Sequence, residues 1–430
     1  MTDEASITVG QEMHRFIADL YPICRSITGD GVRETLNLIR KHIPVEIHEI
    51  PTGTKIFDWT VPKEWNIQDA YIKNHKGERV VDFKTSNLHV VSYSQPIHTK
   101  MTLGELKPYL HTLPEFPEWI PYRTSYYKES WGFCLTYKEF QELQDDQYEV
   151  CIQSSLKKGS LTYGEYVIPG HTDEEVLISV HVCHPSLCND NLSGMGLATT
   201  LAMKIRLEKP RYTYRFLFIP GTIGSIAWLA KNRKKTKRIR YGLVLTGVGD
   251  KGAFTYKKSR KGNAEVDRVL SHVLKHSQWK HHIIDFFPYG YDERQYCSPG
   301  FNLPVGCLMR TPHGQYPEYH TSGDNLDFIR PEYLEQSFLV CLQSINVFEK
   351  NKVYRSLNPF CEPQLGKRGL YRAIGGQAEG AKREMAMLWV LNLSDGDHSL
   401  LDIAERSNIP FDIISEAGKI LFDHHLLEEA

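Results

Sequence analysis

Hydrophobic and polar positions follow three different patterns along the chain. Over residues 8–43, apolar side chains recur every three or four positions, which is typical of amphipathic helices. Over residues 45–164, apolar and polar residues alternate between turn-forming pairs, which indicates a β-rich module. Further along, short apolar runs alternate with helical segments. We therefore expect the β-rich module to be inserted into an α/β domain that comprises residues 1–44 and 165–350.

The apolar runs of the α/β domain predict its architecture. EVLISVHV, TYRFLFIPG, YGLVLTGVG and LPVGCLMR are short and continuous, as in strands that are buried on both faces. Because helical segments alternate with these runs, we expect a mostly parallel sheet with helices on both faces. Ligands of such sheets bind at the carboxyl ends of the strands. The residues that follow EVLISVHV are therefore candidates for a functional site.

Residues 352–430 follow a separate pattern, a proline- and glycine-rich linker and then a series of short helices. The turn Asn408-Ile409-Pro410 fits a helix-turn-helix, so we expect a winged-helix domain. Its last helix, Phe411 to Leu421, contains Lys419 as its only basic residue, whereas a helix that reads DNA should neutralise phosphates. A structural or partner-docking role is therefore favoured, DNA reading is the alternative, and nucleic acid is not expected as a partner.

Composition and charge narrow the class of protein. With 51 basic and 52 acidic residues among 430, the overall charge indicates no polyanionic partner. No signal peptide is visible, no apolar run reaches about 18 residues, and the nine cysteines form no CxxC pair. We therefore expect a cytoplasmic protein without a membrane span or a disulfide framework. The basic run from Lys231 to Arg240 is either a solvated face or a surface for an anionic substrate, and a homo-oligomer is left open.

Two segments carry residue types that bind metals. HVCHPSLCNDNLSG places His181 directly after an apolar strand and Asp190 just before a helix, where backbone donors can orient a carboxylate. GQYPEYHTSGDNLDFI places His320 at the end of a loop. Zinc takes three or four nitrogen, sulfur or carboxylate ligands and keeps an open position when it is catalytic. A histidine near an aspartate is more often structural, so the first segment alone leaves both interpretations open.

Together, HVCHPSLCNDNLSG and YHTSGDNLDFI resemble the paired signatures of the di-zinc aminopeptidase superfamily. The resemblance implies that His181, Asp190 and His320 are metal ligands. TGTKIFDWTVPKEWNIQDAYI, PYRTSYYKESWGFCL and YDERQYCSPGFNLPV resemble a bacterial branch, the aminopeptidase-like proteins with a β-rich insert and a C-terminal winged helix. That branch is associated with polysaccharide biosynthesis. The likeness covers nearly the whole chain and implies an aminopeptidase-like fold.

The chain departs from the superfamily where two catalytic glutamates are expected. The strand FLFIPG leads to Gly221 and Thr222 instead, although the branch itself should read P-E-T-I-G-S here. In VLTGVGD, Thr246 and Gly247 replace a further aspartate of the superfamily. Glycine cannot accept a proton, and threonine replaces a carboxylate ligand poorly. We therefore expect one zinc ion rather than two, and weakened hydrolysis unless another residue serves as the base.

Other residues are candidates for the missing roles. His184 is a candidate ligand or catalytic base, or else a histidine that is hydrogen-bonded within its loop. Glu293 is the best remaining catalytic carboxylate, and Arg294 beside it could bind a substrate carboxylate with two hydrogen bonds; a loop ion-pair cluster is the alternative. Tyr319 is a candidate for substrate binding. Cys183 stands where the superfamily has an aspartate that orients the first histidine, and we expect it to be a packed thiol.

Three functions compete on this evidence. The favoured one is a zinc-dependent hydrolase of the aminopeptidase-like type that cleaves an amide or peptide-like bond in a small-molecule or peptide-like substrate. The second is a binding or regulatory protein on a peptidase scaffold that has lost its base. The third is an amide-forming or amide-transferring enzyme, in which the missing hydrolytic base would be an advantage because attack by water must be suppressed.

Overall fold

The computed structural model describes residues 7–370 and 378–430. The chain forms two compact units, Met1–Ala264 with His282–Phe338 and Glu265–His281 with Leu339–Ala430. Within the described ranges, no helix is long and apolar enough to cross a membrane. All nine cysteines lie in these ranges and carry free thiols.

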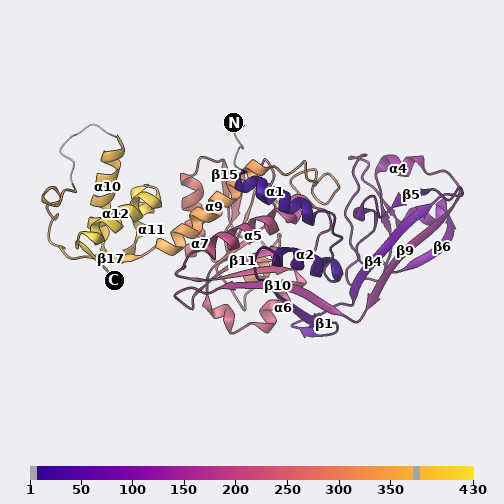
Figure 1. The fold of residues 1–430 in the computed structure, drawn as a ribbon, viewed down its shortest axis with the longest axis horizontal. Coiled ribbons are helices and arrows are strands. Elements are labelled where there is room, and N and C mark those ends of the chain that lie inside the picture. Colours follow the sequence, from indigo (N-terminus) through magenta and orange to yellow (C-terminus); the bar gives the residue numbers. More distant parts are fainter. Residues whose placement is uncertain (1–6, 371–377) are drawn as a thin grey trace, which may run out of the picture. The chain divides into compact units, whose positions relative to one another are not determined.

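An eight-stranded sheet forms the centre of the first unit (Figure 1), in the order β1-β10-β12-β11-β13-β16-β14-β15. The middle strands β12, β11, β13 and β16 are parallel to one another, whereas β1, β10 and β14 pair antiparallel with their neighbours. The mostly parallel sheet that the apolar runs predict is therefore confirmed. The strand bounds are β1 Glu46–Pro51, β10 Ser160–Ile168, β11 Glu175–His181, β12 Thr213–Ile219, β13 Ile239–Leu245, β14 Phe254–Lys257, β15 His281–Ile284 and β16 Val305–Met309.

Helices cover both faces of this sheet, as predicted (Figure 1). On one face lie α6 (Ile223–Lys231) and α8 (Glu293–Tyr296), whose apolar side chains share a core with Leu177, Leu217 and Val244 of the strands. On the other face lie α1 (Val9–Leu20), α2 (Asp30–Arg40) and α5 (Ser193–Ile205). The loops that join strands to α5 and α6 therefore leave from the same carboxyl edge, which is where a site is expected.

A second, antiparallel sheet has the order β5-β4-β9-β6 and its own apolar core. Its strands are β4 Glu64–Lys73, β5 Arg79–Asp82, β6 Ile97–Thr102 and β9 Gln147–Lys157. All four lie in the predicted β-rich insert. However, β1 and β10 belong to the central sheet. Their alternating pattern had placed β1 and residues 160–164 of β10 in the predicted insert. β1 is mostly exposed or half-buried, whereas most of β10 is buried, so the alternating sequence of β10 does not reflect a solvated face.

Shorter elements complete the first unit. They are β2 Lys55–Ile56, β3 Trp59–Thr60, α3 Leu103–Leu106, β7 Leu110–His111, β8 Phe133–Cys134 and α4 Tyr137–Glu142, together with 3-10 turns at Asn87–His89, Lys107–Tyr109 and Lys235–Arg238. The long helix α9 (Pro331–Lys350) continues along the chain into the second unit.

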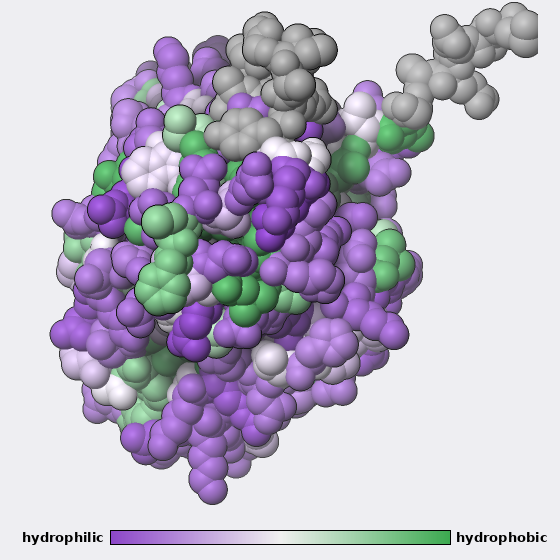
Figure 2. Space-filling model, turned by 90° about the vertical axis from the view of Figure 1, so that its left-hand side faces the viewer, coloured by the Kyte–Doolittle hydropathy of each residue, from purple (hydrophilic) through white to green (hydrophobic). Residues whose placement is uncertain are grey.

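The second unit contains the predicted winged helix. Strands β17 (Val353–Ser356), β18 (Asp395–Ser399) and β19 (Leu427–Glu429) form an antiparallel sheet with β17 in the middle. The helices are α7 (Glu265–His276), α10 (Ala378–Leu393), α11 (Leu400–Ser407) and α12 (Phe411–Asp423), and a 3-10 turn spans Gly366–Arg368. Asn408, which ends α11, has a positive φ of 53°, as a helix C-terminus favours. The face shown in Figure 2 is mainly hydrophilic, with small separate hydrophobic areas.

Candidate metal centre

The candidate metal centre lies at the carboxyl end of β11, near the middle of the central sheet. His181 is the last residue of this strand, and Asp190 lies in the turn Cys188–Leu192 that leads into α5. The two residues are almost completely buried, with exposures of 1% for His181 and 0% for Asp190. The strand therefore delivers an imidazole, and the turn a carboxylate, to one buried point at the sheet edge.

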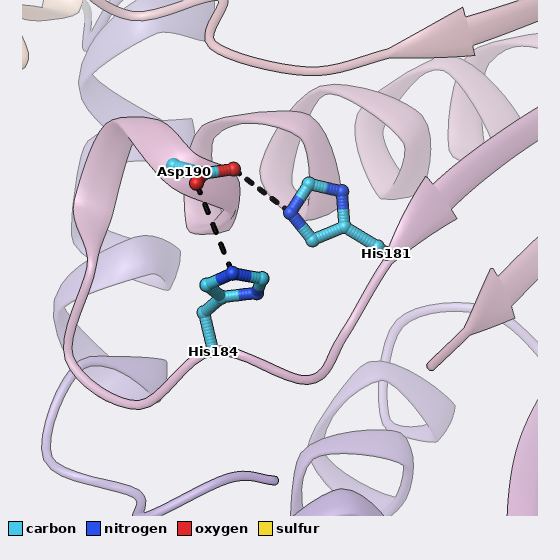
Figure 3. A group of neighbouring side chains, drawn as sticks. All are labelled: His181, His184 and Asp190. Atoms are coloured by element: carbon cyan, nitrogen blue, oxygen red, sulfur yellow. Dashed lines mark hydrogen bonds and ion pairs between the residues drawn. The ribbon is translucent and has the colours of Figure 1, made fainter. Parts of the chain in front are cut away.

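Three imidazoles surround the carboxylate of Asp190. His181 Nε2 lies 2.9 Å from Asp190 Oδ1, and His320 Nε2 lies 3.0 Å from Oδ2. His184 Nε2 is 3.9 Å from the same Oδ2, and its ring points toward the carboxylate from the loop after β11 (Figure 3). The structure thus brings together the three residues that the resemblance implied as ligands, and adds His184 to them.

Burial and mutual charge decide the protonation of this group. Burial alone would raise the pKa of Asp190, but the charge of His184 and hydrogen bonds from His181 and His320 outweigh it and hold that pKa well below its usual range. Burial also lowers the pKa of His184 well below its usual value. At neutral pH the group therefore offers a carboxylate beside a neutral His184, which are the forms that bind metal ions.

The backbone around Asp190 is held by a second buried carboxyl group. Asp324 Oδ1 accepts a hydrogen bond from the backbone N–H of Asn189 at 2.5 Å, and Oδ2 accepts one from the N–H of Asp190 at 3.0 Å. Burial raises the pKa of Asp324 well above its ordinary value. Because Asp324 lies in the loop that also carries His320, this contact joins the two segments that were predicted to form one site.

His320 is positioned by aromatic neighbours from both sides. The ring of Tyr319 stacks on that of His320, with centroids 4.0 Å apart. Tyr122, from the segment between β7 and β8, donates its backbone N–H to the carbonyl of His320 at 2.7 Å and places its ring 5.2 Å from the imidazole. The side chain of His320 is 34% exposed. Tyr319 is therefore at the accessible side of the group, as a substrate-binding role requires.

The donor atoms lie at spacings that suit a metal ion. Ligand atoms about 2.0–2.1 Å from a tetrahedral zinc lie roughly 3.3 Å from one another. The separations of 2.9, 3.0 and 3.9 Å around Asp190 bracket that value. His181, His184 and Asp190 also offer donor atoms that all lie within 4.8 Å of one another. Imidazole nitrogens and carboxylate oxygens are among the ligand atoms that zinc takes.

Tyr291 fills the space beside the centre that a side chain at position 221 would occupy. A Cβ placed on Gly221 would lie 1.9 Å from Cε1 of Tyr291 and 2.7 Å from its hydroxyl oxygen. The Tyr291 ring instead stacks on His181 with centroids 3.7 Å apart. Gly221→Glu alone would therefore force the new side chain to overlap with the Tyr291 ring.

Glu293 is engaged in a buried ion pair. Its Oε1 lies 2.5 Å from Nζ of Lys257, and the two side chains are 0% and 1% exposed. Both carboxylate oxygens also accept the backbone N–H of Tyr291 at 3.1 Å. Arg294, the next residue in α8, is partly exposed. Of the two alternatives for Glu293, the geometry matches an ion-pair cluster, and a catalytic role stays a prediction, as does substrate binding by Arg294.

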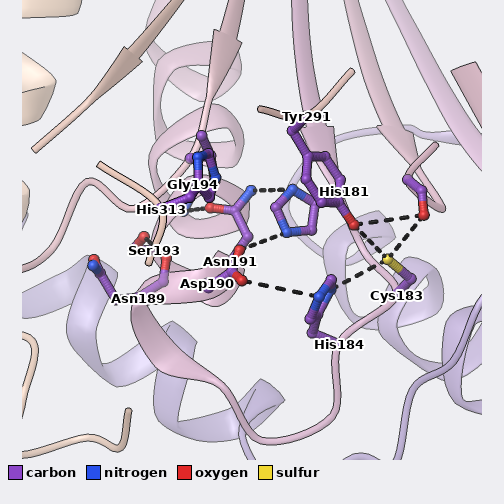
Figure 4. A network of polar contacts seen from close by, with 12 residues as sticks. His181, Cys183, His184, Asn189, Asp190, Asn191, Ser193, Gly194, Tyr291 and His313 are labelled. Carbon is purple, nitrogen blue, oxygen red and sulfur yellow. Dashed lines mark hydrogen bonds and ion pairs between the residues drawn. The ribbon is translucent and has the colours of Figure 1, made fainter. Parts of the chain in front are cut away.

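Sequence reasoning did not identify two residues that line the centre. His313 lies in the same loop as His320, is half-buried and places Nε2 3.2 Å from Thr246 Oγ1. A second histidine so close to His320 in a loop was the available signal. Tyr291 had no comparable signal, because it reaches His181 only through the fold. Figure 4 shows both residues around His181.

Cys183 contacts His184 rather than His181. Its Sγ lies 3.3 Å from His184 Nδ1 and 3.1 Å from the hydroxyl of Tyr291 (Figure 4). Burial raises the pKa of this thiol to about 12, so it is uncharged at neutral pH. The residue that replaces the orienting aspartate of the superfamily is therefore buried as expected, but it also has polar partners.

Comparisons with known proteins agree with this fold. The model of a family described as a domain of unknown function, DUF4910, matches residues 14–351, and a winged helix-turn-helix model matches residues 352–429. A Clostridium acetobutylicum protein, provisionally named a polysaccharide biosynthesis protein with an aminopeptidase-like domain, is 56% identical over 423 residues, which cover 98% of this chain and 97% of that protein.

Solved structures show the same architecture. A crystal structure from Clostridium acetobutylicum, provisionally named a peptidase, matches with a TM-score of 0.94 and 55% identity, covering 98% of this chain and 96% of the other. A zinc aminopeptidase from Bacillus subtilis matches with a TM-score of 0.57 at 12% identity, covering 80% of this chain and 96% of the other. The second likeness shows the fold alone. The chain therefore belongs to the DUF4910 family, as an aminopeptidase-like protein with a C-terminal winged helix.

Proposed function

We propose that this protein is a zinc-dependent hydrolase that cleaves an amide or peptide-like bond. The observation that carries the proposal is the convergence of His181, His184 and His320 on the buried carboxylate of Asp190. We assign the single zinc ion to His181, Asp190 and His320. When bound, zinc supplies Lewis-acid polarisation of a carbonyl oxygen and makes water more acidic.

The side chains of this chain would then handle protons and position the substrate. His184 is neutral at pH 7 because burial lowers its pKa, so its imidazole can accept a proton from attacking water. Because the Glu293 carboxylate already binds Lys257 and the Tyr291 backbone, we assign the base to His184 first and keep Glu293 as the second candidate. Tyr319 would contact the substrate beside His320, and Arg294 would bind a substrate carboxylate.

The cellular setting is also part of the proposal. The relative that is 56% identical is named for polysaccharide biosynthesis, and we place this hydrolase in such a biosynthetic context and in the cytoplasm. Its substrate would then be a small molecule or a peptide-like compound with an amide bond.

One observation favours a second candidate function, a binding or regulatory protein on a peptidase scaffold. The Tyr291 ring closes the space in which a catalytic glutamate at position 221 would stand. A chain that had kept its metal centre and lost its base would bind ligands without hydrolysing them.

Metal analysis and kinetics test the first proposal. Purified protein should hold about one zinc per chain, and Asp190→Asn should lose it, whereas Asp285→Asn, at a highly exposed aspartate, should keep it. The zinc-loaded protein should hydrolyse leucine p-nitroanilide, and His184→Gln should keep zinc but lower kcat by about 10² to 10⁴. Equal zinc contents in the wild type and Asp190→Asn would contradict the assigned site.

A double variant separates the two candidate functions. Gly221→Glu combined with Tyr291→Ala removes the ring that blocks the new side chain, whereas Gly221→Glu alone keeps the overlap. If the wild type binds zinc but does not hydrolyse the substrate, and the double variant gains hydrolysis, the scaffold function is supported. If the wild type hydrolyses the substrate and the double variant brings no gain, the hydrolase with His184 as its base is supported.

A further inference from the structure

Cys183 connects three groups that come from different parts of the chain. Its Sγ lies 3.3 Å from His184 Nδ1, 3.1 Å from the Tyr291 hydroxyl and 3.6 Å from the carbonyl oxygen of Gly221. The side chain is 1% exposed. Three polar partners around one buried sulfur are more than packing requires, because a thiol is only a weak donor and a weak acceptor.

The chemistry of the partners determines the direction of these hydrogen bonds. The Gly221 carbonyl can only accept, and both the S–H of Cys183 at 3.6 Å and the O–H of Tyr291 at 3.5 Å lie within reach of it. When the S–H donates to this carbonyl, the sulfur is left as an acceptor for its other two partners, the Tyr291 O–H and an N–H of His184. In that arrangement the proton of His184 lies on Nδ1, which leaves a lone pair on Nε2.

The other end of the imidazole supports the same assignment. His184 Nε2 is 3.9 Å from Asp190 Oδ2, which is beyond hydrogen-bond distance. That oxygen already accepts from His320 Nε2 at 3.0 Å. A proton on His184 Nε2 would therefore have no acceptor in Asp190, whereas a proton on Nδ1 has the sulfur of Cys183.

We propose that Cys183 is a positioning residue, which fixes His184 in the Nδ1–H tautomer and so turns the Nε2 lone pair toward the metal centre. Only the catalytic use of that lone pair rests on the proposed function. The tautomer itself is a property of the protein without metal.

Gly221 and Tyr291 complete the arrangement. Only a residue without a side chain at position 221 leaves room for the Tyr291 ring, and the ring carries the hydroxyl to the sulfur. The ion pair of Lys257 with Glu293 holds the loop in place: Glu293 accepts the Tyr291 N–H, and Lys257 Nζ donates to the carbonyl of Tyr289 at 2.8 Å. The buried pair therefore acts on His184 through Tyr291 and Cys183.

Nitrogen NMR of metal-free protein labelled with ¹⁵N-histidine tests the inference, with a His184→Gln sample to assign the signals. At a pH where His184 is neutral, Nδ1 of the wild type should resonate as a protonated, pyrrole-type nitrogen and Nε2 as an unprotonated, pyridine-type nitrogen. The opposite assignment in the wild type would overturn the proposal whatever the hydrolysis assay shows, so the two can fail separately.

Variants at position 183 test whether the thiol is the cause. Cys183→Ala and Cys183→Val both remove the acceptor, and each should shift the Nε2 signal toward the protonated type. Cys183→Ser offers another acceptor and should restore the wild-type pattern. Cys297→Ala removes an equally buried thiol that donates to backbone carbonyls of Leu303 and Val305, and it should leave the His184 signals unchanged. Wild-type His184 signals in a folded Ala or Val variant would overturn the role of Cys183.

Discussion

Asp292 is a buried carboxyl group that lies next to the ion pair of Glu293. Its Oδ1 accepts a hydrogen bond from the Ser225 hydroxyl at 2.8 Å, while its Oδ2 is buried with no hydrogen-bond partner among the described residues. Burial, together with the charge of Glu293, raises its pKa from 3.8 to about 7. The folded protein therefore holds a proton here at pH values at which the unfolded chain has released it.

The sign of the pH effect follows from this difference. Because the folded state binds the proton more tightly, the contribution of Asp292 to stability is full below about pH 4 and is lost as the pH rises toward 7. Between about pH 5 and pH 8 the loss is roughly 3 kcal/mol. Asp292→Asn should remove this loss. In urea unfolding, the stability of the variant relative to the wild type should therefore increase as the pH rises. Asp285→Asn, at a highly exposed aspartate, should show the same pH dependence of stability as the wild type. A parallel pH dependence for all three proteins would refute the raised pKa of Asp292.

Among the elements, three neighbouring strands share a buried charge cluster. Arg215 of β12 donates to Glu175 of β11 at 2.7 and 2.8 Å and to Glu165 of β10 at 2.6 Å, and Trp228 of α6 donates to Glu165 at 2.9 Å. All three charged side chains are less than one-tenth exposed. One guanidinium therefore binds two carboxylates inside the sheet that presents His181.

Removing this guanidinium should be strongly destabilising. Arg215→Met would leave two buried carboxylates without their guanidinium partner, and the free energy of unfolding should fall by about 3–5 kcal/mol. Arg238→Met breaks an exposed pair with Asp173 at 3.6 Å and should cost less than about 1 kcal/mol. Urea unfolding near neutral pH measures both. A similar small loss for the two variants would mean that the buried cluster is not required for stability.

In the molecule as a whole, the winged-helix unit carries a helix-turn-helix with an unfavourable charge for DNA. On α12, Asp412, Glu416, Lys419 and Asp423 are exposed, so three acidic side chains accompany one basic side chain. Phosphate contacts supply most of the affinity in DNA binding. The acidic surface therefore favours docking to a protein partner over DNA reading.

Fluorescence anisotropy with labelled duplex DNA and the full chain tests this expectation. The wild type should show no binding at about 50 mM salt, where basic proteins already bind non-specifically. The triple variant Asp412→Lys, Glu416→Lys, Asp423→Lys should gain weak, salt-dependent binding, which would show that charge is the limiting factor. Submicromolar binding by the wild type would contradict the proposed role of this unit.

The amino-acid sequence by itself determined the class of fold and the core of the site. Continuous apolar runs predicted the parallel strands because burial on both faces excludes polar residues. His181, Asp190 and His320 were accessible to motif comparison because each stands at a junction between a regular element and a loop. The edge strand β1 and its neighbour β10 were assigned to the insert, because pairing partners distant in sequence leave no local signal.

Only the tertiary structure decided what occupies the space beside Gly221. Tyr291 fills the space above Gly221, which is 70 residues away in the chain, and no local periodicity encodes such a contact. The same holds for the pairing of Glu293 with Lys257 and for the contact of Cys183 with His184. Whether a side chain is free to act depends on the partners that contact it in the fold. Those partners come from elements distant in the chain, and local sequence patterns do not reveal which distant elements are neighbours in space.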